Sequence, residues 1–138
     1  NRMYGKRGFY QHQSLIPPQH AAQAMTELLK TIRTSGQGSF LAVMKNHGSE
    51  QSPGRNSFCF EGTSLALDFA NKGAKTNDLI AALDAIVMRY EGRLYPAKDG
   101  LMSAQTYKRG FPHWQELEAM RDPALNSAFW QRVIGSDA

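Results

Sequence analysis

The chain has 138 residues, of which 41% are hydrophobic and 20% charged, and its formal net charge is +4. This length suits one ordinary domain, and no apolar run approaches the roughly 20 residues that cross a bilayer. The Lys and Arg residues are scattered, which favours a solvated surface over a nucleic-acid footprint. The basic amino end has no apolar stretch behind it, so we expect no signal peptide.

The chain does not begin with Met and enters a strand almost at once. We therefore interpret residues 1–138 as a single domain that is a fragment of a longer polypeptide. Cys59 is the one cysteine, which excludes an internal disulfide and indicates a reducing, cytoplasmic compartment. Attachment at the periphery of a membrane stays open. Because no His or basic cluster adjoins Cys59, we expect its thiol to be buried and inert.

The first third of the chain predicts a strand, a helix and a second strand. Residues 9–16 alternate, with Gln11, Gln13 and Leu15 on one face and His12 on the other. Two prolines end this strand and open an amphipathic helix, which stops at Gly36. A strand over 40–46 follows, and the stretch 47–57 is rich in Gly, Ser and Pro, which predicts a flexible loop.

The remaining elements repeat this order. A strand begins at Phe58 or Thr63 and ends at Phe69, and a helix capped by Thr76 or Asn77 ends at Gly92. A short strand is expected at 93–95, and helical pieces at 103–108, 114–120 and 125–133. The order strand, helix, strand, strand, helix, strand predicts an α+β fold. We expect a ferredoxin-like antiparallel sheet with two helices on one face, plus a helical C-terminal extension.

The sheet face opposite the helices is predicted to be polar. Glutamines two apart on a strand project in parallel and suit sugar hydroxyls, and a lysine can hold an anion. A face wetted by solvent is the alternative. The residues expected on this face are Gln11, Gln13, Lys45, Ser64 and Asp68, with Ala66 as a small gap.

The run 92–99 is the most informative segment of the sequence. Lys98 follows a strand end, beside Tyr95 and a turn stiffened by Pro96. Such a lysine is well placed for a site, although a surface lysine paired with Asp99 is an equally good interpretation. The four histidines are isolated, so no metal site is expected. Gly36-Gln37-Gly38 lacks the third glycine and the preceding strand of a phosphate-binding loop.

Three runs, at 39–45, 65–69 and 92–99, resemble the C-terminal region of FAD-linked oxidoreductases of the vanillyl-alcohol-oxidase type. Aldonolactone oxidases are more distant relatives. The resemblance covers residues 9–133. It implies the substrate-binding cap domain of a two-domain flavoenzyme, in which a sugar or lactone CH–OH group loses a hydride to FAD. The FAD would be bound mainly by a missing N-terminal domain, so this fragment is not expected to turn over alone.

The resemblance also implies residue roles. Lys98 would act in catalysis and contact the flavin, where an ammonium stabilises the anionic reduced ring, and Tyr95 would orient the substrate alcohol. The residues implied for the sugar or phosphate pocket are Gln11, Gln13, Lys45, Ser64 and Ala66. Ser64-Leu65-Ala66 stands where relatives carry Asn-x-Cys, so the substrate is left open among sugars, phosphorylated sugars and lipid-linked sugars.

Two other functions share this predicted fold. A flavin-independent ligand-sensing or regulatory module is the first alternative, because fold does not fix function. An RNA-binding domain should carry stacking aromatic residues on the central strands. The corresponding positions are Lys45, Ser64, Ala66 and Asp68, so we expect no nucleic-acid partner.

Overall fold

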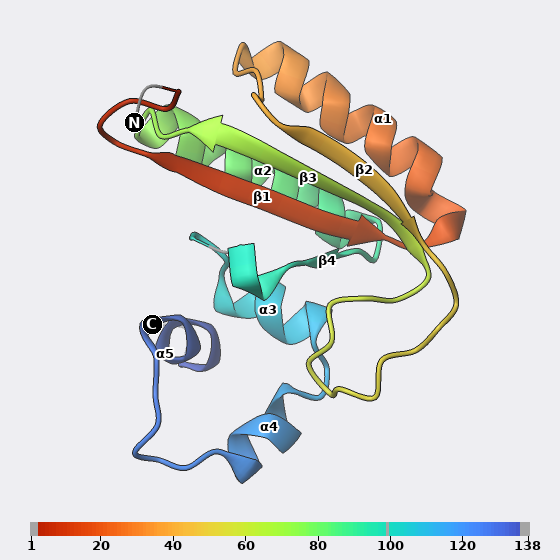
Figure 1. Cartoon of the computed structure of the whole chain (residues 1–138), viewed down its shortest axis with the longest axis vertical. Coiled ribbons are helices and arrows are strands. Elements are labelled where there is room, and N and C mark those ends of the chain that lie inside the picture. The colour runs from red at the N-terminus through yellow and green to blue at the C-terminus, as the bar shows by residue number, and fades with distance from the viewer. Residues whose placement is uncertain (1–2, 99, 136–138) are drawn as a thin grey trace.

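A four-stranded antiparallel sheet forms the centre of the molecule (Figure 1). The structure is a computed structural model and describes residues 3–98 and 100–135. The strands lie in the order β2-β3-β1-β4. Chain order and strand order together are those of a ferredoxin-like sandwich, which confirms the predicted α+β fold class. The elements are β1 (Phe9–Ile16), α1 (Pro18–Ser35), β2 (Ala42–His47), β3 (Gly62–Ala70), α2 (Ala74–Arg89) and β4 (Arg93–Leu94).

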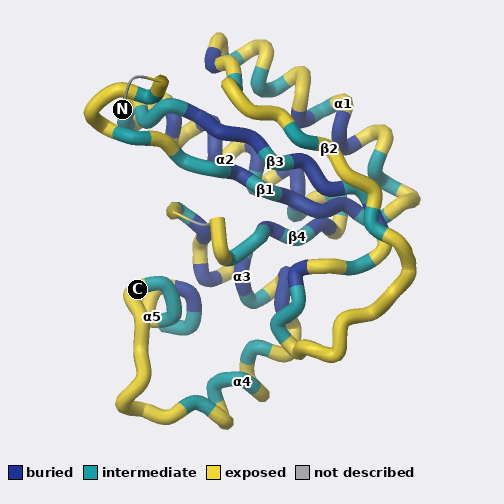
Figure 2. The backbone as a smooth tube through the Cα atoms, in the orientation of Figure 1, coloured by how far each residue is buried: buried dark blue, intermediate teal, exposed yellow. Residues whose placement is uncertain are grey.

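Both long helices cover one face of the sheet, with α1 against β3 and α2 against β1 (Figure 1). The alternation of β3 explains this packing, because Leu65, Leu67 and Phe69 point toward the helices and are at most 3% exposed. Figure 2 shows β3 and the end of β1 as buried, whereas β2 is largely exposed. The core therefore lies between the sheet and the two helices, and β2 is an open edge.

The predicted C-terminal extension is present on the β4 side of the sheet (Figure 1). It starts with a short 3-10 turn and continues as three short helices. Ser103 and Ser127 begin the first and third of these helices by accepting hydrogen bonds from Thr106 N–H and Trp130 N–H. The elements are η1 (Pro96–Lys98), α3 (Ala104–Gly110), α4 (Trp114–Met120) and α5 (Ala128–Ile134).

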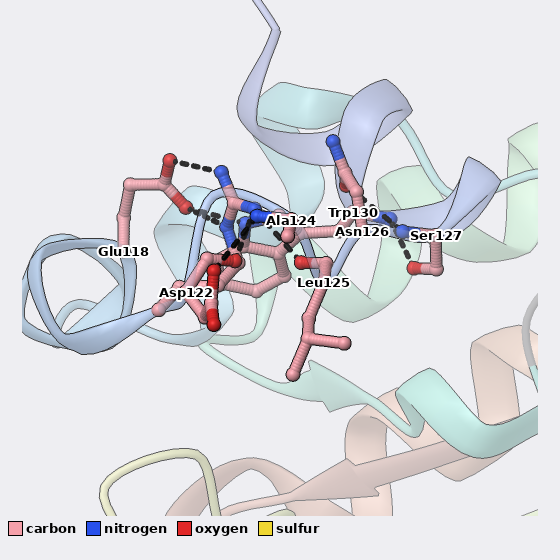
Figure 3. Close-up of polar contacts among 8 residues, drawn as sticks. Glu118, Asp122, Ala124, Leu125, Asn126, Ser127 and Trp130 are labelled. Carbon is pink, nitrogen blue, oxygen red and sulfur yellow. Dashed lines mark hydrogen bonds and ion pairs between the residues drawn. The ribbon is translucent and has the colours of Figure 1, made fainter.

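A polar network joins α4 to α5 (Figure 3). The Arg121 guanidinium donates to both carboxylate oxygens of Glu118, each at 2.8 Å, and to the Leu125 carbonyl at 2.8 Å. Trp130 Nε1 donates to the same carboxylate at 2.6 Å. The turn between the two helices is therefore fixed by one carboxylate and one guanidinium.

Some predicted boundaries were wrong. Helix α2 begins at Ala74 rather than at a Thr76 cap, because the buried Thr76 hydroxyl donates instead to the Ala70 carbonyl and to Gln37 Oε1, both at 2.9 Å. Strand β2 starts two residues later than expected and includes His47. The last strand is shorter, since the backbone turns into η1 after Leu94.

The loop between β2 and β3 turns back toward α3 and α4. The Tyr107 hydroxyl donates to Asn56 Oδ1 at 2.8 Å, and Arg55 pairs with Glu116 at 3.1 Å. Cys59, in the same loop, is exposed, so its predicted burial is wrong. The loop packs on aromatic rings around Phe58, which leaves the adjacent thiol in solvent.

Candidate active site at the free edge of β1

The strand register builds the predicted polar face. Residues opposite each other in an antiparallel pair share a face. Gln11 lies opposite Asp68, and Gln13 lies opposite Ala66. On the other side of β3, Lys45 lies opposite Ser64. The residues predicted to line a pocket from these three strands therefore do share the face that α1 and α2 leave open.

This face has a free edge where β4 stops. Strand β4 pairs with β1 only at Ser14 and Leu15, and the Tyr95 N–H then donates to the Gln13 carbonyl at 2.9 Å. Toward Phe9, β1 has no further strand partner on this side within the described residues. The early end of β4 thus opens a small cavity between the edge of β1 and the η1 turn.

Four of the predicted site residues line this cavity, whose volume is about 30 Å³. They reach it from two separate segments of the chain: Gln11 and Gln13 from β1, and Tyr95 and Lys98 from the turn after β4. The sequence alone predicted each of the two pairs from its own motif and did not indicate that the pairs meet. The structure brings them to one place.

Tyr95 is held in position by its ring. It stacks on Phe58, which comes from the β2–β3 loop, with ring centroids 4.6 Å apart and planes 29° from parallel. Within the described residues, the Tyr95 hydroxyl has no hydrogen-bond partner. An aromatic ring that is fixed while its hydroxyl is free can orient an alcohol group of a ligand.

Lys98 ends the η1 turn and is exposed. Its backbone N–H donates to the Tyr95 carbonyl at 3.1 Å, which ties the two residues into one turn. Among the residues that the structure describes, nothing pairs with its ammonium. The suggested partner Asp99 lies outside the described residues. A free ammonium at a cavity wall can stabilise an anion that arrives there.

Gln11 belongs to a fixed hydrogen-bond network. Its Nε2 donates to Asp68 Oδ1 at 2.8 Å, and the Tyr4 hydroxyl donates to Asp68 Oδ2 at 2.9 Å. Burial raises the pKa of Tyr4, and its hydrogen bond to the Asp68 carboxylate raises it further. Asp68 is itself only 6% exposed, so its role is to orient Gln11 rather than to meet solvent.

The other three predicted residues lie outside this cavity. Lys45 is exposed on edge strand β2, two strands away from β1. Ser64 is buried, and its hydroxyl is 2.9 Å from His47 Nε2, so that hydrogen-bonding capacity is already used. Ala66, on β3, lies opposite Gln13 of β1, and its small side chain leaves space on this face of the sheet.

The sequence analysis missed a buried pair on the other side of β1. His12 was interpreted as isolated, yet its Nε2 lies 3.0 Å from Asp84 Oδ1 on α2, and the two side chains are 4% and 14% exposed. Both residues line the same small cavity as Lys98. His12 lies on the strand face whose other residues meet the helices, and a buried imidazole requires a hydrogen-bond partner. This position of His12 was the signal in the sequence that could have predicted the pair.

This arrangement can hold a small polar molecule at the edge of β1. It offers amide groups, a phenol and an ammonium on one side and an imidazole–carboxylate pair on the other. Within the described residues, no group of three or more His, Cys, Asp or Glu side chains could hold a metal ion. In the same part of the chain, no helix combines the length and apolarity needed to cross a bilayer.

Fold and site together define an α+β sandwich with a candidate small-molecule site on the open side of its sheet. The chain matches no protein-family model.

A curated relative agrees with the resemblance found in the motifs. Over 127 residues the chain is 35% identical to decaprenylphosphoryl-beta-D-ribose oxidase of Mycolicibacterium smegmatis. The aligned residues cover 89% of this chain and 27% of that protein. The predicted resemblance to FAD-linked oxidases is thereby confirmed. The chain spans about a quarter of the length of the relative that it matches.

Proposed function

We propose that this chain is the substrate-binding part of an FAD-dependent oxidoreductase that oxidises a CH–OH group of a sugar or sugar lactone. The observation that carries the proposal is the convergence of Gln11, Gln13, Tyr95 and Lys98 on one cavity. These are the residues that the family resemblance assigns to the substrate and the flavin. The similarity to a ribose oxidase supports an oxidoreductase context.

The described residues fit one part of a flavin site. The Lys98 ammonium is exposed and without a described partner, so it is available to an anionic ring. When bound, FAD would accept the hydride that leaves the substrate carbon. Lys98 would then stabilise the negative charge gained by the ring, and the rest of the cofactor would be held by polypeptide outside this chain.

The remaining residues would orient the sugar. Gln13 and the amide oxygen of Gln11 offer hydrogen bonds to hydroxyl groups, and the Tyr95 hydroxyl would receive or donate one at the reacting alcohol. Lys45 lies farther along the same face, where its charge would suit a phosphate that extends away from the sugar. A phosphorylated or lipid-linked sugar, like the one in the relative's name, would place its hydroxyl groups beside the two glutamines and its phosphate beside Lys45.

An exposed apolar patch supports a second part of the proposal, namely that another domain docks here. Phe9, Phe40 and Leu41 are 48%, 65% and 43% exposed. Tyr4 joins them by stacking on Phe9 at 4.3 Å and meeting the edge of Phe40 at 5.5 Å. Large exposed aromatic groups gathered in one place are typical of an interface.

The test uses the full-length polypeptide that contains this chain. Its visible spectrum is recorded after purification, and ribose 1-phosphate or an aldonolactone is added without oxygen. We expect flavin bands that bleach with one of these compounds. In Lys98→Ala the bands should remain and the bleaching should be lost, whereas Lys30→Ala, an exposed lysine on α1, should bleach as the wild type does.

A full-length protein that holds no flavin and cannot be loaded with FAD would refute this function. The leading hypothesis would then be a ligand-sensing module that uses the same sheet face.

A further inference from the structure

Oxidation of an alcohol removes a proton as well as a hydride, and the residues assigned above leave that proton without an acceptor. A lysine ammonium carries three donors and no lone pair, so Lys98 in its charged form cannot take it. An acceptor must reach the reacting hydroxyl directly or through one water. The inference below rests on the proposed function and supplies this missing group.

His12 has the burial and the partner that such an acceptor requires. It is 5% exposed, and its Nε2 lies 3.0 Å from Asp84 Oδ1. A carboxylate only accepts hydrogen bonds, so this contact places the ring hydrogen on Nε2. The other nitrogen, Nδ1, is then left with its lone pair in the neutral ring.

The other ring nitrogen of His12 is free among the described residues. Nδ1 of His12 has no hydrogen-bond partner among the described residues. Two side-chain atoms of those residues are buried and lack a hydrogen-bond partner, namely Ser14 Oγ and Arg93 Nε. Nδ1 of His12 is not one of them, so it retains some accessible surface. His12 is among the residues that line the small cavity, and we place this accessible surface there.

The cavity has room for water. Its volume of about 30 Å³ exceeds the roughly 10–15 Å³ that one water molecule requires. The titratable groups that line it are Tyr10 and His12 from β1, Asp84 from α2, and Tyr95 and Lys98 from the turn after β4. One water could therefore join His12 to a hydroxyl held beside Tyr95.

We propose that His12, oriented by Asp84, accepts the hydroxyl proton of the substrate through water in this cavity. With FAD bound, the substrate carbon would lose its hydrogen with two electrons to the flavin, and its C–O bond would become a carbonyl. The hydroxyl proton passes to the water, which transfers one of its own protons to His12 Nδ1. His12 thus acts through water, and Asp84 is a positioning residue that fixes the ring nitrogen used.

The test compares variants of the full-length flavoprotein in anaerobic rapid mixing with the sugar that bleaches the wild type. We expect His12→Gln to slow flavin reduction by about 100-fold or more, the usual worth of general base catalysis. Asp84→Asn should slow it by at least about tenfold with the sugar dissociation constant unchanged.

Two control variants match the chemistry without lining the cavity. His20, on α1, also pairs with a carboxylate, Glu91, at 3.6 Å, but the two side chains are 36% and 67% exposed. Asp78 lies on α2 as Asp84 does and is exposed. His20→Gln and Asp78→Asn should both keep the wild-type rate of flavin reduction.

A second measurement needs no variant and no turnover. Histidine-selective ¹⁵N labelling of the full-length protein, with or without flavin, reports which ring nitrogen carries hydrogen. A His12 that is protonated on Nδ1 and bare on Nε2 would overturn the inference. A His12→Gln protein that bleaches with the sugar at the wild-type rate would also overturn the inference, and in that case the proposed oxidoreductase function would stand. A wild type that never bleaches would overturn both.

Discussion

Gly92 lies where the chain leaves α2 and enters β4, and the surrounding core leaves no room for a side chain. Its N–H donates to the Val87 carbonyl at 2.8 Å. A methyl group at this position would lie 2.5 Å from Ile16 Cδ1 and 2.9 Å from the Leu15 carbonyl oxygen. The backbone of β1 cannot yield without moving the strand that carries the site.

We therefore expect Gly92→Ala to lower the free energy of unfolding by about 1–3 kcal/mol, the usual effect of overpacking. Urea denaturation followed by circular dichroism measures this change. Gly48→Ala is the control, because an added methyl group there meets nothing within 4 Å, and it should change stability by less than about 0.5 kcal/mol. Equal stability of the two variants would contradict the packing at Gly92.

At the scale of elements, a polar network joins α4 to α5. Neither helix has more than one buried residue, and the Glu118 network joins them (Figure 3). Hydrogen bonds from Arg121 and then from Trp130 lower the pKa of Glu118 from 4.5 to about 2. The charged carboxylate is thus favoured in the folded tail.

The sign of the pH effect follows from this lowered pKa. The stabilisation by Glu118 is fully present above about pH 4.5 and is lost as the pH falls toward about 2. We expect the near-ultraviolet circular dichroism of the tryptophans to change over that range in the wild type. In Glu118→Gln the signal should already be altered at neutral pH. Glu116→Gln, on the same helix and largely exposed, should behave as the wild type.

At the scale of the whole molecule, the two ends of the open face differ. The end near Phe58 is covered by the β2–β3 loop, while the end near Phe9 and Phe40 is bare and aromatic. The relative is much longer than this chain. Under the proposed function, the part that binds FAD would cover the bare end.

If that part docks on the aromatic patch, Phe40→Ser should act only in the full-length protein. We expect the free energy of unfolding of the 138-residue chain to change by less than about 0.5 kcal/mol, because Phe40 is 65% exposed. The full-length protein should become less stable by about 1–3 kcal/mol, the worth of one buried phenylalanine. Thermal unfolding of both proteins measures the difference, and an unchanged full-length protein would place the interface elsewhere.

Local pattern was enough to predict most of the fold. The alternation in 9–16 and the helical spacing after Pro17 depend only on neighbouring residues, and both elements match the structure. The left-handed backbone of Gly36, with φ of 66°, confirms the predicted end of α1. The start of α2 failed as a prediction because the Thr76 hydroxyl bonds to Gln37, which is 39 residues away in sequence.

By itself, the sequence determined the order of strands and helices, the polar residues of β1 and the turn that carries Lys98, because each depends on spacing over a few residues. Only the tertiary structure decided which of these residues meet. The early end of β4 opens the edge of β1 to Lys98 and Tyr95, while α2 brings Asp84 to His12 across 72 residues of chain. Such contacts depend on strand register and helix packing, which couple distant segments and leave no local pattern.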